Sequence, residues 1–147
     1  MNKLNYVLFL MLFSASFVLI SQTLSFDPNT GDEKFDQQLH NINADLSKDI
    51  SEFKHRVAFK YNIKETKVSD LLIEMEPAEV LITLQMLTIT SRPLEDILNS
   101  YKENRKNGWK AIAADLGIKS NSTSFRELKN VIIYNETPVN ESSLSQR

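Results

Sequence analysis

Residues 108–118 have the sequence GWKAIAADLGI, and this stretch carries the clearest structural signals in the chain. Trp109, Ile112 and Leu116 fall at helical spacing, so they share one face of a short helix. Gly117 follows at the position where a helix commonly ends in a left-handed conformation, which glycine adopts freely. We therefore expect a helix that packs Trp109 inward and a turn that brings the chain back onto the core.

The same stretch is similar to the first helix and turn of a helix-turn-helix, where alanine permits close helix contact and glycine a sharp turn. Residues 100–130 also carry seven basic and three acidic side chains, a local surplus of positive charge. The loop after Ile118 is longer than the turn of about three to four residues in that motif. The whole chain has a net charge of −2, which does not favour nucleic acid. We expect a packing corner and no nucleic-acid partner, and DNA binding is kept as an alternative.

Positive charges gather around this corner and suggest a possible interaction face. It comprises Lys102, Arg105, Lys106, Trp109 and Lys110. Such a face would meet an acidic surface or partner. The sequence leaves open whether Trp109 belongs to the core or to this binding surface.

Two prolines predict where the helices before the corner begin. Pro77 suits the first turn of a helix over residues 77–90, PAEVLITLQMLTIT. This helix is apolar almost all round, which places it in the middle of a bundle; its β-branched residues make a strand the alternative. Pro93 begins a second helix, over residues 93–107. A shorter helix ends near Met75.

Apolar residues recur at steps of three and four over residues 33–60, which predicts one amphipathic helix of about seven turns. They are Phe35, Leu39, Ile42, Leu46, Ile50, Phe53 and Val57. Thr30 and Glu33 are spaced as a capping box at its start. The stripe packs either against the rest of the chain or against a second copy, in a homodimer through residues 33–60.

A last helix is expected after the loop that follows Ile118. Ser124 and Glu127 are spaced as its capping box. The side chains predicted to line it are Phe125, Leu128, Val131 and Ile132.

The N-terminal residues predict export. Lys3 is the only charged residue before Asp27, and the run between them is apolar. A positive start followed by an apolar stretch is typical of a secretory signal peptide. The run is also long enough to span a bilayer, so a retained membrane anchor is the alternative. Both interpretations place the body outside the cytoplasm, in the periplasm or the extracellular space.

Residues typical of catalysis or metal binding are few. The chain has no cysteine, and therefore no disulfide or thiolate metal site. His40 and His55 lie away from the apolar stripe and are expected to be solvated. The pairs Asp70 with Glu74 and Glu76 with Glu79 have helix-surface spacing and are expected to be surface acids. We predict no catalytic residue, no cofactor and no metal ion.

These patterns predict an all-α fold, a small helical bundle with a long N-terminal amphipathic helix and a helix-turn-helix-like corner. The chain divides into four predicted parts. They are a signal peptide or membrane anchor (1–25), the long amphipathic helix (26–62), a compact helical domain (63–134) and a disordered tail (135–147).

Two stretches carry a resemblance to a known family. SRPLEDILNSYKENRKNGWKAIAADLGI spans residues 91–118, and SFRELK spans residues 124–129. With the residues before them, from about 68, they resemble a family of uncharacterised secreted or envelope bacterial proteins. That family has a Gly-Trp-Gly segment followed by Ile-Ala-x-x-Leu-Gly-Ile. The chain departs from the pattern at Lys110, where the family has a second glycine. The resemblance implies a small helical envelope protein with no established activity.

The function expected from the sequence is therefore that of a non-catalytic exported protein of the cell envelope, which acts by binding a protein or a surface. An enzyme with an unrecognised site is the first alternative, and a helix-turn-helix DNA-binding protein is the second.

Overall fold

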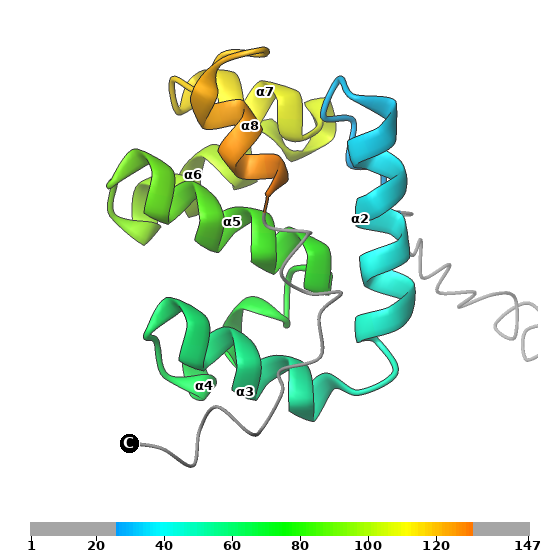
Figure 1. The fold of residues 1–147 in the computed structure, drawn as a ribbon. Helices are drawn as coiled ribbons and strands as arrows, with labels where there is room; N and C mark the ends of the chain where they lie inside the picture. The colour runs from blue at the N-terminus through cyan, green and yellow to red at the C-terminus, as the bar shows by residue number, and fades with distance from the viewer. Residues whose placement is uncertain (1–25, 131–147) are drawn as a thin grey trace, which may run out of the picture.

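The computed structural model describes residues 26–130, and every regular element in this part of the chain is a helix (Figure 1). The predicted all-α class is therefore confirmed. The elements are α2 (Glu33–Leu46), α3 (Ile50–Tyr61), α4 (Glu65–Leu71), α5 (Pro77–Thr90), α6 (Leu94–Asn104), a 3-10 turn (Arg105–Asn107), α7 (Trp109–Asp115) and α8 (Thr123–Lys129). The predicted leader, the tail and the last helix's Val131 and Ile132 lie outside the described residues.

Helix α5 is the central element, with α3 and α4 on one side and α7 and α8 on the other (Figure 1). Its residues from Pro77 to Leu84 are all buried, so the apolar surface all round this helix is covered. Pro77 occupies the first turn, as predicted, because its missing N–H has no partner to lose there. The strand alternative for this segment is wrong.

The predicted single helix over residues 33–60 is wrong, because the chain forms two helices that meet at Ser47–Asp49. Ser47 donates its hydroxyl to the backbone oxygen of Asn43 at 2.6 Å. Asp49 accepts the N–H of Glu52 at 3.0 Å and caps α3. Serine and aspartate bind nearby backbone groups in this way and so compete with a continuing helix.

The apolar stripe of α2 and α3 packs inside the chain. Phe35, Leu39, Phe53 and Val57 are buried in the same core as α5, α6 and α7, whereas Ile50 at the break is 37% exposed. The predicted segments 26–62 and 63–134 thus share one core over the described residues. The homodimer through residues 33–60 stays a prediction, and most of the stripe is already covered within the chain.

Two predicted capping boxes are wrong by two residues each. Asp32, not Thr30, caps α2 by accepting the N–H of Phe35 at 3.1 Å. Ser122, not Ser124, caps α8 by accepting the N–H of Phe125 at 3.0 Å. In both places a second capping residue stands close to the predicted one, and the spacing alone does not choose between them.

The corner, which we define as residues 105–118, has the predicted form. Trp109 is only 3% exposed, and its ring lies 5.5 Å from that of Tyr101. At the end of α7, Gly117 has φ +85° and donates its N–H to Ala114, while Ile118 donates to Ala113 at 2.7 Å. These two bonds form a Schellman motif, which satisfies the last carbonyls of the helix.

Among residues 26–130, no helix combines the length and the apolar character needed to cross a membrane.

Candidate functional site

A cleft of about 340 Å³ opens where the beginning of α5, the end of α6 and the beginning of α7 meet the N-terminal segment. We call it the corner cleft. It is lined by Phe26, Asp27, Asn29, Glu76, Glu79, Tyr101, Lys102, Arg105, Lys106, Gly108, Trp109 and Ile112.

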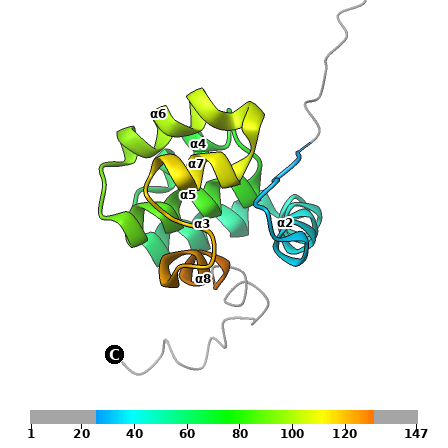
Figure 2. The ribbon, with the colours of Figure 1, turned by 90° about the horizontal axis from the view of Figure 1, so that it is seen from above.

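One wall of the corner cleft is the strap, residues 26–31, which crosses the beginning of α7 (Figure 2). The carbonyls of Pro28 and Asn29 accept the N–H groups of Trp109 and Lys110 at 2.8 and 3.1 Å. These are first-turn N–H groups, which have no partner inside their own helix. The strap therefore caps α7 from a position about 80 residues earlier in the chain.

Gly108 makes this approach possible. Its backbone has φ +80° and ψ 175°, a conformation that is open in practice only to glycine. A Cβ atom at this position would lie 2.5 Å from the Cβ of Asn29. The glycine before the tryptophan is thus required by both the backbone angle and the strap.

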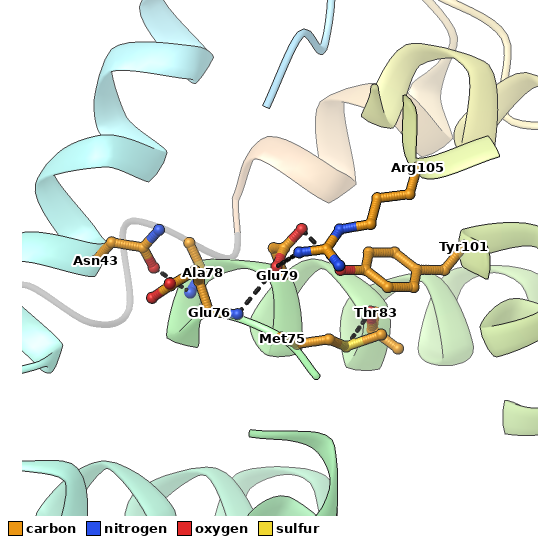
Figure 3. Close-up of polar contacts among 8 residues, drawn as sticks. All are labelled: Asn43, Met75, Glu76, Ala78, Glu79, Thr83, Tyr101 and Arg105. Carbon is orange, nitrogen blue, oxygen red and sulfur yellow. Dashed lines mark hydrogen bonds and ion pairs between the residues drawn. The ribbon is translucent and has the colours of Figure 1, made fainter. Parts of the chain in front are cut away.

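Glu79 lies at the back of the corner cleft, and its burial contradicts the prediction of a surface acid. The residue is 4% exposed. One carboxylate oxygen accepts the N–H of Glu76 at 2.9 Å, and the other accepts the hydroxyl of Tyr101 at 3.0 Å (Figure 3). Arg105 lies 3.8 Å from the first oxygen. The carboxylate therefore joins the beginning of α5 to the end of α6.

Burial changes the acidity of this pair. It raises the pKa of Glu79 above the usual range for a glutamate, and the hydrogen bonds from Glu76 and Tyr101 and the charge of Arg105 offset this only in part. Burial, followed by the charge of Glu79, raises the pKa of the Tyr101 hydroxyl. Tyr101 thus stays a hydrogen-bond donor throughout the physiological pH range.

Asn43 and Met75 each make one polar contact with a residue of α5 (Figure 3). The side-chain oxygen of Asn43 accepts the N–H of Ala78 at 2.7 Å. The sulfur of Met75 accepts the hydroxyl of Thr83 at 3.7 Å. The first contact joins the beginning of α5 to α2, and the second holds the segment before α5 against the middle of the same helix.

Three cations stand along the α6 side of the corner cleft, and we call them the cationic edge: Lys102, Arg105 and Lys106. All three are exposed. Lys102 lies 4.0 Å from Glu74, a distance at which an exposed ion pair contributes little. Within the described residues, Lys106 has neither a hydrogen bond nor an ion pair.

The structure divides the predicted interaction face. The cationic edge lines the corner cleft, together with one edge of the buried Trp109. Lys110 is exposed but does not line the cleft, and its aliphatic stem lies against Gly31 of the strap. Trp109 therefore belongs to the core and contributes only to the floor of this site.

The two histidines are exposed and lie outside the corner cleft. His40 contacts the ring of Phe26 edge-on at 5.4 Å between centroids. His55 pairs with Glu65 at 2.9 Å on the surface of α3 and α4. Within residues 26–130, no group of three or more His, Cys, Asp or Glu residues is placed to hold a metal ion.

Sequence reasoning missed Glu79, although a signal for it was present. Glu79 stands in the first turn of a helix that is apolar almost all round, three residues after Glu76. A glutamate three residues after the N-cap also accepts the N–H of the N-cap residue. The spacing thus predicts the hydrogen bond from Glu76, whereas the burial of the carboxylate and its contact with Tyr101 are decided by the tertiary structure.

We compared the chain with models of protein families, with curated proteins and with solved structures, and none of them matches it.

Proposed function

We propose that this chain is a non-catalytic exported helical protein that binds a protein or a surface of the cell envelope through the cationic edge. The observation that carries the proposal is the arrangement of Lys102, Arg105 and Lys106 along one side of a cleft, three exposed cations that make no close ion pair within residues 26–130. Clustered charge of one sign attracts a partner of the other sign and steers its approach.

The position of the strap connects the cationic edge with the export that we propose. Phe26 and Asp27, which line the corner cleft, directly follow the predicted leader at residues 1–25. The hydrogen bonds from Trp109 and Lys110 hold the strap against the corner. A retained anchor would therefore enter the body beside the cationic edge, and a cleaved leader would leave the new N-terminus there.

We favour binding over catalysis because of how Glu79 is used. It is the one buried carboxylate in the described residues, and a raised pKa in a cleft is a general feature of catalytic acids. Both of its oxygens, however, already accept hydrogen bonds from Glu76 and Tyr101. We assign it the task of joining α5 to α6.

We also favour binding of an acidic partner over DNA recognition. Helix α8 would be the reading helix of a helix-turn-helix, but it spans only residues 123–129 and starts after a seven-residue gap from α7. Lys129 is paired with Asp32 at 2.7 Å, and Arg126 donates to Thr123 at 3.0 Å. The basic side chains of α8 are thus occupied.

Export is tested by fractionating the producing cells and measuring the mass of the mature chain. The expected result is an N-terminus between residues 22 and 27, or an intact form in the membrane fraction. Full-length soluble protein in the cytoplasm would contradict the proposal.

Binding is tested by sedimenting purified protein with the envelope fraction of the same cells at low and physiological salt. The double variant Lys102→Glu/Lys106→Glu should lose most of the sedimenting protein. Lys64→Glu/Lys67→Glu, which changes the net charge equally on the exposed surface at α4, is the matched control and should bind as the native chain does. Equal losses for both variants would show that net charge, and not the cationic edge, governs binding.

A further inference from the structure

We propose that the corner cleft binds a carboxylate or phosphate group attached to an apolar body, with Arg105 and Lys106 holding the anion. This inference rests on the proposed function in using the same cationic edge, but it does not require export. It names the chemical group that the edge recognises and places the attached body inside the cleft.

Arg105 is the residue best suited to hold such an anion. Its guanidinium lies over the ring of Tyr101, 5.3 Å from the centroid, which fixes its position. Its one ionic partner, Glu79, is 3.8 Å away, whereas a charge-assisted hydrogen bond is about 2.7–2.9 Å long. Within the described residues the guanidinium makes no hydrogen bond. Its donors are therefore oriented and unused.

The chemistry of the ligand follows from those donors. A guanidinium presents a planar fork of N–H groups that matches the two oxygens of a carboxylate or a phosphate. Lys106 adds a second, unpaired positive charge on the same side of the cleft. Together they favour an oxyanion over a halide or a neutral polar group.

The opposite wall limits how much negative charge the ligand carries. Asp27 of the strap and Glu76, just before α5, line the corner cleft and are exposed, and the buried Glu79 lines it as well. These acids repel a second anionic group in the cleft. The ligand therefore has its anion at the cationic edge and an uncharged remainder.

The floor of the cleft suits an apolar remainder. Tyr101, Trp109 and Ile112 line it, and Phe26 of the strap stands beside them in the lining. Its volume of about 340 Å³ falls at the lower end of the range for small-molecule sites, about 300–1,000 Å³. A single ring next to the anion matches this size and composition.

Trp109 provides a direct readout, because it is the only tryptophan in the chain and it lines the cleft. The purified protein is titrated with phenyl phosphate, phenylacetate, inorganic phosphate and benzyl alcohol, and binding is followed by tryptophan fluorescence and by calorimetry. Phenyl phosphate or phenylacetate should bind at least tenfold more tightly than both inorganic phosphate and benzyl alcohol. The ratio between the two phenyl anions decides between a phosphate and a carboxylate.

Two variants locate the anion. Arg105→Lys keeps the charge but removes the fork, and it should weaken the preferred probe by about tenfold, the loss expected for a charge-assisted hydrogen bond. Arg126→Lys on α8 is the matched control and should leave the affinity unchanged. Lys106→Gln, at a side chain without a partner in the described residues, should weaken binding without changing the melting temperature.

Three results would overturn the inference: no binding of either phenyl anion, equal binding of benzyl alcohol, or equal effects of Arg105→Lys and Arg126→Lys. Probe binding without charge-dependent sedimentation with the envelope would support the inference and contradict the proposed function. Sedimentation that depends on the cationic edge, without probe binding, would contradict the inference alone.

Discussion

The corner and the α3–α4 hairpin, residues 50–71, are built from helices of similar composition but are held in different ways. The corner buries Trp109, receives the strap through two backbone hydrogen bonds and adjoins the internal carboxylate of Glu79. On the hairpin, Phe59 is 78% exposed and the pair of His55 with Glu65 lies on the surface. Ile73, just beyond it, is 81% exposed.

The difference concerns individual side chains, because the hairpin also buries Phe53, Val57 and Val68. A side chain with almost no exposed surface loses its whole packing environment when it is truncated. An exposed side chain such as Phe59 loses almost nothing. We therefore expect truncation of the buried Trp109 to unfold the protein more readily than truncation of the exposed Phe59.

The largest effect is expected for the two aromatic side chains. Trp109→Ala should lower the free energy of unfolding by about 3–5 kcal/mol, because it empties a large buried site. Phe59→Ala, the control in the hairpin, should change it by no more than about 0.5 kcal/mol. Both are measured by chemical unfolding followed by circular dichroism. Similar losses would show that the side chain of Phe59 is packed and not exposed.

The two ends of α7 provide the next comparison, through their glycines. A strained backbone alone costs about 1–3 kcal/mol of the free energy of unfolding. Gly108→Ala should cost more than that, because the new Cβ would also lie 2.5 Å from the Cβ of Asn29. Gly117 has φ +85°, but a Cβ atom added there would have no other atom within 4 Å. Gly117→Ala should therefore cost only the strain of the left-handed backbone, about 1–2 kcal/mol. Thermal unfolding of both variants measures the difference. Equal costs would mean that the strap moves away from the new Cβ at residue 108 without lowering the free energy of unfolding.

A smaller effect is expected at two helix caps. Asp32→Ala and Asp49→Ala each remove a capping carboxylate, which typically costs about 0.5–2 kcal/mol. Asp32 should cost more, because it also accepts Lys129 at 2.7 Å and thereby joins α2 to α8. Urea unfolding of both variants and of Lys129→Ala checks this order. A larger loss for Asp49→Ala would contradict this order and show that α3 depends more on its cap than α2 does.

The last prediction concerns pH and is measured as a slope. The pKa of Glu79 is raised in the folded state, so its stabilising contribution is present below the unfolded pKa, near 4.5, and is lost as pH rises through the folded value. The stability of the native chain relative to Glu79→Gln should therefore rise on acidification. Glu65→Gln, on the surface of the hairpin, controls for removal of a charge. A flat difference for Glu79 would mean that water reaches its carboxylate.

Several features of the fold were predictable because they depend on neighbours in the sequence. Pro77 starts a helix since proline lacks the N–H that a first turn does not use. Gly117 ends α7 in the predicted left-handed conformation, and Asn62 ends α3 in the same one. Helical periodicity similarly placed Trp109 with Ile112 and Leu116 in the core.

The sequence by itself thus determined the all-α class, the approximate ends of most helices and the inward face of the corner, all through interactions within a few residues. Only the tertiary structure decided the burial of Glu79, the position of the strap and the presence of the corner cleft. Each of these depends on partners far apart in the chain, such as Ala78 with Asn43 or Trp109 with Pro28. The spacing of residues along one helix carries no information about which helix ends lie together in the fold. Here the ends of α5, α6 and α7 lie together, so they surround the carboxylate of Glu79 and leave the cationic edge exposed beside it.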